Sequence, residues 1–256
     1  MMIDFAALFL AGFVGGILNS IAGGGSFITF PALVFAGVPP LLANATNTFA
    51  SSAGYLSGVF AFRRQLKAHK KEVILTICAS LFGGGLGAVL LLNTSESNFQ
   101  KAIPWLLLFA SLLFIFGGKA NQMLKQFTLN QRHALKIEFV LLTLVLVSVC
   151  IYGGFFNAGL GIVVLSYLTL AGHTNINVMN GIKLVVSSSV SLIAIVLFIF
   201  HGSIAWLEGS FVLLGTLLGG YYSAQVSMRL PQIYIRYFVI FISCVTTAYF
   251  FYITYL

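Results

Sequence analysis

Two glycine-rich interruptions of long apolar segments are the places in this sequence best suited to chemistry. The first covers residues 22–26 and the second covers residues 157–161. Glycine is a poor helix former, and unwound backbone at membrane depth survives only inside protein or beside a wet cavity. Exposed backbone N–H groups and the positive end of the following helix favour an anion. We therefore expect a midplane anion site whose lining includes Gly23, Gly24, Gly25, Ser26, Asn157 and Gly159.

Lys183 lies six residues into the apolar span 178–200 and is the second feature that predicts an anion site. An ionisable side chain at that depth is expensive and indicates function. Polar residues at related positions could complete the site: Asn47 and Thr46 in one helix, Asn180 beside the lysine, and Asn19 just before the first interruption. We expect all of them to contact the substrate.

Each assignment has a structural alternative. Glycines spaced four apart, as in Gly12/Gly16 and Gly215/Gly219, allow two helices to pack closely. Lys183 could extend to the lipid headgroups, or it could fasten two helices by bonding backbone carbonyls.

Other chemistries lack the residues that they need. The acidic residues and histidines fall at span ends or in loops, and the three cysteines lie inside apolar runs. The sequence shows no metal-ligand spacing, no phosphate-binding loop and no pattern typical of a catalytic triad. We therefore predict no catalytic residue, no metal and no cofactor, and we do not expect an enzyme.

Composition sets the class of protein around these residues. Hydrophobic residues make up 59% of the 256 and charged residues only 7%, with a mean hydropathy of +1.03. A soluble domain is about 25% charged. The apolar runs are continuous rather than alternating, which excludes a transmembrane β-barrel. The net charge of +8 comes from short loops, so it indicates topology and contact with membrane lipid, not nucleic-acid binding.

The sequence predicts an all-α polytopic membrane protein with about eight full or near-full spans and two glycine-broken helix hairpins. A polar loop is expected over residues 118–136. The expected helices are 5–22, 27–36, 42–62, 73–92, 102–117, 138–156, 162–171, 178–200, 208–226 and 232–254.

A nearly constant spacing relates the two halves of the chain. Asn44 precedes Asn180 by 136 positions, and the same offset relates Ser51 to Ser187 and Gly83 to Gly219. A shared offset of this kind indicates an internal duplication. We predict one transmembrane repeat over residues 1–137 and a second over residues 138–256.

The basic residues favour an inverted relation between these repeats. They are dense in the loops 63–71 and 118–136, which are separated by two spans and can both be cytoplasmic. Inversion also places Arg229 and Arg236 in the cytoplasm, whereas a parallel arrangement places them outside. We predict inverted repeats in a multi-pass protein of the cell inner membrane, with both termini outside.

Residues 19–33 resemble the TauE/SafE family of sulfite-exporter-like membrane transporters. The resemblance continues through 43–47 and the basic pair Arg63 and Arg64, and it resumes at 152–156 and at Lys183. It implies transport of sulfur-containing anions such as sulfite and sulfoacetate. Relatives often carry an acid just ahead of each break, where this chain has Asn19 and Gly153. Proton coupling through such acids is therefore not implied here.

These observations together predict an exporter or facilitator of small anions, of the sulfur oxyanion or organosulfonate class, that works by alternating access. A negative-inside potential drives an anion outward by about 2.3 kcal/mol per charge per 100 mV, so no coupling ion is needed. The alternatives are an anion channel and a non-transport membrane enzyme or assembly subunit. The expected partners are the anionic substrate and membrane lipid, and a homo-oligomer is left open.

Overall fold

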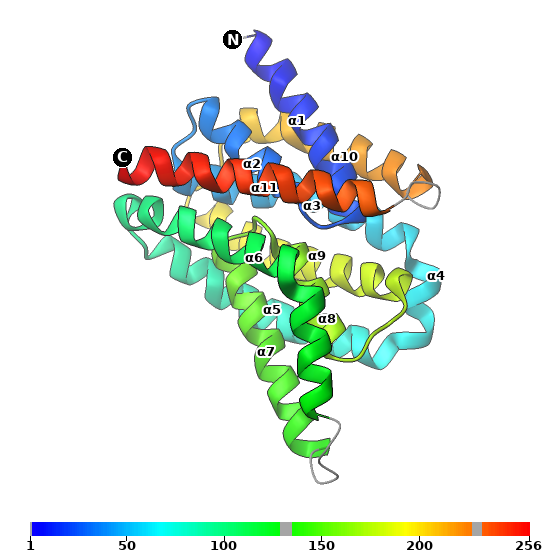
Figure 1. The fold of residues 1–256 in the computed structure, drawn as a ribbon. Coiled ribbons are helices and arrows are strands. Elements are labelled where there is room, and N and C mark those ends of the chain that lie inside the picture. The colour runs from blue at the N-terminus through cyan, green and yellow to red at the C-terminus, as the bar shows by residue number, and fades with distance from the viewer. Residues whose placement is uncertain (1, 129–134, 227–231) are drawn as a thin grey trace.

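The computed structural model describes residues 2–128, 135–226 and 232–256, and every regular element within these ranges is a helix (Figure 1). This agrees with the all-α prediction. The bounds are α1 Met2–Ile21, α2 Ser26–Phe35, α3 Pro40–Ala61, α4 Arg63–Leu66, the 3-10 helix η1 Lys67–His69, α5 Lys70–Leu92, α6 Glu96–Thr128, α7 Leu135–Phe155, α8 Leu160–Leu170, α9 Ile176–Phe200, α10 Trp206–Val226 and α11 Gln232–Tyr255.

Two predicted loops are largely helical, and both predictions were wrong in that respect. The segment 63–71 forms α4, η1 and the start of α5, and α6 continues through residue 118 to Thr128. Lysine, arginine, glutamine and leucine are all good helix formers, so a change from apolar to polar composition does not by itself end a helix. Residues 129–134 of the predicted 118–136 loop lie outside the described residues. In Figure 1, α6 and α7 extend together beyond the rest of the bundle.

The two breaks fall where the glycines predict them. The N–H groups of Ala22 and Gly23 both donate to the Leu18 carbonyl, which closes α1, and Gly23 then takes a φ of +83°. Gly159 has a φ of +82° immediately before α8. Glycine adopts this left-handed conformation without the steric cost that other residues meet.

Four helices in the described part of the chain are long and apolar enough to cross a membrane. They are Arg63–Leu92, Glu96–Phe116, Ile176–Phe200 and Tyr237–Tyr255. Shorter apolar helices accompany them at Phe5–Ile21, Ser26–Phe35, Val140–Phe155 and Leu160–Leu170.

Glycines bring two helix pairs to backbone contact. A side chain at Gly12 or Gly16 of α1 would collide with the backbone of α10, at Val212 and Thr216 respectively. A side chain at Gly83 of α5 would likewise collide with α7, where Cys150 lies. The α1–α10 pair and the α5–α7 pair are each parallel, because contacts advance in the same direction along both helices. The alternative of close packing therefore holds for these GxxxG glycines.

The central helices run in opposite directions. Gly58, near the end of α3, faces Leu184 of α9, and Gly181, near the start of α9, faces Phe62. The α6–α11 pair is also antiparallel, since Ser111 contacts Thr247 while Trp105 donates to the Tyr255 hydroxyl at 3.0 Å. Figure 1 shows α3 and α9 crossing the middle of the bundle in this way. The helices α3 and α9 carry four of the predicted site residues, Thr46, Asn47, Asn180 and Lys183.

Candidate functional site

The two breaks meet each other inside the protein. A Cβ atom added to Gly23 would lie 2.7 Å from the Gly161 carbonyl carbon, and one added to Gly161 would lie 2.7 Å from the Gly23 Cα. Only glycine permits this approach of one backbone to the other. The structure thus brings together the two glycine-rich segments 22–26 and 157–161, as the site prediction requires.

A chain of hydrogen bonds organises the first break. The Asn19 side-chain oxygen accepts a hydrogen bond from the Gly25 N–H at 2.8 Å. The sequence predicts that this N–H is free for a ligand, whereas in the structure it is already bonded. The Thr29 hydroxyl lies 3.4 Å from the Gly25 carbonyl and also bonds to the Asn47 side-chain oxygen. Side chains from α1, α2 and α3 are therefore held around the same short loop.

Lys183 reaches the end of α1. Its Nζ donates to the backbone carbonyls of Asn19 at 3.1 Å and Ser20 at 3.3 Å, and to the Asn180 side-chain oxygen at 3.1 Å. The last carbonyls of a helix lack intrahelical partners and carry partial negative charge, so a cation suits them. With three acceptors, all three N–H donors of the ammonium are engaged. The helix-fastening alternative for Lys183 is therefore met in the structure.

Several buried polar atoms near this break have no hydrogen-bond partner in the protein. They include the amide nitrogens of Asn19 and Asn47, which are 2% and 0% exposed, and the Ser26 hydroxyl. The hydroxyls of Ser187 and Ser188 on α9 are also buried without a hydrogen-bond partner. A buried donor without an acceptor costs about 1–3 kcal/mol. Two amide donors left open at the same loop indicate a place for an acceptor that is not part of the chain.

The second break is satisfied by the protein itself. The Asn157 side chain accepts from the Tyr55 hydroxyl at 2.9 Å and donates to the Ser191 hydroxyl at 3.3 Å. The Asn44 amide nitrogen donates to the Phe155 carbonyl at 2.9 Å, at the end of α7. Asn44 thus donates a hydrogen bond to a carbonyl at the end of α7, as Lys183 does at the end of α1. The two breaks have similar backbone conformations. The amide nitrogens of Asn19 and Asn47 at the first break lack partners, whereas the Asn157 side chain at the second break has a partner for each polar atom.

The remaining predicted residues contact other parts of the protein. The Thr46 hydroxyl accepts the Ala205 N–H at 2.9 Å and so holds the turn before α10. Gly24 faces the side chain of Val239 on α11, and Gly159 faces Ala110 and Phe27. These positions shape the surroundings of the breaks rather than present polar atoms to them.

Sequence reasoning missed Thr29, Tyr55 and Ser191. All three are buried, and each hydrogen-bonds to a predicted site residue. A signal for two of them was available, because Tyr55 and Ser191 are separated by the same 136 positions that relate Asn44 to Asn180. The two residue types differ, so the offset alone did not single out either residue as part of the site.

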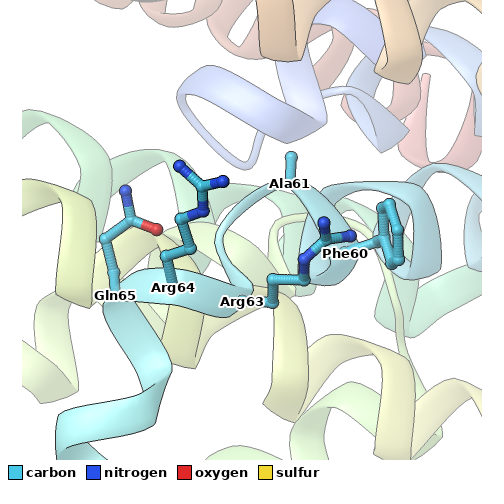
Figure 2. A pocket seen from close by; sticks show the side chains of 5 residues that line it. All are labelled: Phe60, Ala61, Arg63, Arg64 and Gln65. Carbon is cyan, nitrogen blue, oxygen red and sulfur yellow. The ribbon is translucent and has the colours of Figure 1, made fainter.

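A separate basic pocket of about 330 Å³ lies at the turn between α3 and α4, and it is open to the surface. It is lined by Phe60, Ala61, Arg63, Arg64 and Gln65, and Figure 2 shows the two guanidinium groups on the same side of the turn. The Arg63 guanidinium carbon stands 3.8 Å from the centre of the exposed Phe60 ring, a cation–π contact. Nearby, Glu72 pairs with His69 at 3.3 Å and with His173 at 2.6 Å.

Apolar helices that could cross a membrane, joined to buried polar residues at two broken helices, are typical of a membrane transporter. The described residues contain no cluster of three His, Cys, Asp or Glu side chains that could hold a metal ion. Residues 8–250 match the family described as Sulfite exporter TauE/SafE, and the chain belongs to that family.

Curated relatives carry transporter names. A "Probable membrane transporter protein" of Haemophilus influenzae is 31% identical over 95% of this chain and 92% of its own length. The "Probable membrane transporter protein ORF9" of a Sinorhizobium species is 31% identical over 88% of this chain and 82% of its own. The "Probable membrane transporter protein YfcA" of Escherichia coli K12 is 28% identical over 94% and 87%. No solved structure matches the chain at a significant level.

Proposed function

We propose that the chain transports a sulfur oxyanion or an organosulfonate, and that the first break is its binding site. The observation that carries the proposal is the pair of buried, unpartnered amide donors on Asn19 and Asn47. Both are held in place through their oxygens, by Gly25 and Thr29 respectively. Sulfite and sulfonate groups present several acceptor oxygens on one centre, which suits converging donors.

Lys183 supplies the charge that such a ligand needs. Lys183 is 1% exposed, and its ammonium bonds to the backbone carbonyl of Asn19, the residue whose side chain carries one of the two open amides. An anion that leaves water loses solvation that neutral donors replace only in part. Because the three ammonium donors are already engaged, Lys183 acts through its charge, or exchanges the Asn180 oxygen for the ligand.

Burial of the site supports alternating access and argues against an open channel. Asn19, Ser26, Asn47 and Lys183 are each no more than 2% exposed, so a ligand cannot enter unless helices move. The antiparallel α3–α9 and α6–α11 pairs support inverted repeats over 1–137 and 138–256, because a two-fold axis would place equivalent helices in this relation. Ser111 and Thr247, which are in contact, are themselves separated by 136 positions.

The orientation follows from the same inversion. With 63–71 and 118–136 in the cytoplasm, the chain sits in the inner membrane with both ends outside. A negative-inside potential then favours export of an anion, without a coupling ion. We treat the monomer as the transporting unit, since both breaks belong to one chain.

Flux of sulfite from loaded proteoliposomes tests the proposal. Asn47→Ala removes the open donor, and Asn47→Asp replaces it with a carboxylate oxygen while the Thr29 contact can persist. We expect at least about a 10-fold loss of flux in both, with Asp the worse because like charges repel. Asn93→Asp, at an exposed helix end, is the matched control and should transport normally. Normal flux in both Asn47 variants would contradict the proposed site.

A further inference from the structure

Asn157 is held from both sides by residues at equivalent positions of the two halves. Its oxygen accepts from Tyr55 of α3 at 2.9 Å, and its nitrogen donates to Ser191 of α9 at 3.3 Å. Tyr55 and Ser191 are 136 positions apart, the offset that also separates the contacting pair Ser111 and Thr247. Its backbone N–H lies 3.4 Å from the Asn44 side-chain oxygen. Asn157 therefore has a partner for each of its side-chain polar atoms.

Tyr55 also reaches the first break. Its hydroxyl lies beside Ser26 and Ser51, although its hydrogen bond goes to Asn157. The tyrosine is 3% exposed and Ser26 is 1% exposed, so this contact is sealed from solvent. A single side chain thus hydrogen-bonds to Asn157 at the second break and lies near Ser26 at the first.

We infer that Tyr55, Asn157 and Ser191 form a clamp that couples the two breaks, and that Asn157 is a positioning residue rather than a ligand for the substrate. The inference deepens the proposed function and rests on the first break being the binding site. Any movement of α7 and α8 relative to α3 and α9 must break the bonds to Asn157. The clamp therefore stabilises the closed arrangement and sets how often the site opens.

The first test measures opening without any substrate. Cys78, Cys150 and Cys244 are replaced by alanine, and Ser188→Cys places a thiol at a buried position of α9. The rate of its reaction with N-ethylmaleimide in folded protein reports how often the bundle opens. Tyr55→Phe and Ser191→Ala should each accelerate labelling at least about 5-fold, because each removes one arm of the clamp. Tyr255→Phe and Ser111→Ala remove a tyrosine and a buried serine hydroxyl elsewhere, and should leave the rate unchanged.

The second test separates coupling from simple loss of stability. Sulfite flux per folded protein should fall at least about 5-fold in Tyr55→Phe, because the two breaks then open without being coupled to each other. The sulfite KM should stay within about 2-fold of the original. The double variant Tyr55→Phe/Ser191→Ala should match Asn157→Ala, since residues in one network are not additive.

The outcomes distinguish this inference from the substrate assignment. Unchanged labelling in both Tyr55→Phe and Ser191→Ala overturns the clamp, whatever the flux shows. Accelerated labelling in a protein that moves no sulfite leaves the clamp standing and removes the proposed substrate. A large rise in KM for Tyr55→Phe with unchanged labelling would make Tyr55 a substrate ligand instead.

Discussion

Lys183→Met is the most informative single change, because it keeps an apolar stem of similar length and removes one charge. In the structure it also removes three hydrogen bonds, two of which go to backbone carbonyls at the end of α1. The substitution therefore tests two roles of the lysine, the capping of a helix and the attraction of an anion.

The stability effect follows from the carbonyls left behind. Those of Asn19 and Ser20 lose the lysine as a donor, and a buried group without a partner costs about 1–3 kcal/mol. Removal of the buried charge offsets part of this loss of stability, because the ammonium no longer has to be desolvated on folding. We expect a net loss of about 2 kcal/mol, which lowers the thermal midpoint by roughly 4–8 °C for a chain of this size.

Two measurements on the same purified protein separate the roles. Thermal unfolding in detergent gives the midpoint, and titration with sulfite gives the affinity. Lys183→Met should lower both, whereas Lys183→Arg should retain much of the stability and only part of the binding, since the planar guanidinium has a different donor geometry. Lys101→Met, at an exposed position, is the matched control.

Two different results would each contradict one of the proposed roles of Lys183. An unchanged thermal midpoint in Lys183→Met would mean that the α1 carbonyls do not need the ammonium. An unchanged sulfite affinity in a folded Lys183→Met protein would remove the lysine from the anion site and leave the amide donors alone to carry it.

Three further changes test other parts of the account. Gly25→Ala places a methyl group against the Gly15 carbonyl and 2.7 Å from the Asn19 Cγ, so transport should fall at least about 10-fold, whereas Gly85→Ala, 3.5 Å from its nearest neighbour, should be neutral in the same flux assay. A cysteine at Ser203 should react with an impermeant thiol reagent added outside and one at Gln65 should not; the reverse pattern would refute the orientation. Glu72→Gln breaks two partly exposed pairs with histidines, and its thermal unfolding should show a loss below about 1 kcal/mol.

The sequence was sufficient to locate the breaks, because their cause is local. Glycines at 23 and 159 are needed for a positive φ, and no other part of the fold has to be known to see this. The 136-residue offset was equally accessible, since it relates residue types along one chain. The contact of Gly23 with Gly161 shows that the two predicted segments belong to the same place.

The partners of the polar residues were not accessible, because they depend on which helices become neighbours. Lys183 was predicted to contact the substrate, with bonding to backbone carbonyls as the alternative, and the sequence did not show that those carbonyls belong to a helix 164 residues earlier in the chain. Thr46 and Asn47 are adjacent in the sequence but face opposite neighbours, the turn before α10 and the first break. Helical spacing fixes only the face on which a side chain lies, and it leaves open what packs there.

During synthesis, α1 enters the membrane long before the helix that it packs against has been made. Gly12 and its neighbour Val212 are 200 residues apart, which takes about 10–40 s to translate at 5–20 residues per second. The α5–α7 interface needs only the 67 residues from Gly83 to Cys150, so it can assemble first. The glycine face of α1 must then be shielded by lipid or by the insertion machinery until α10 arrives. A ribosome that stops before α10 would leave that face of α1 without its partner helix.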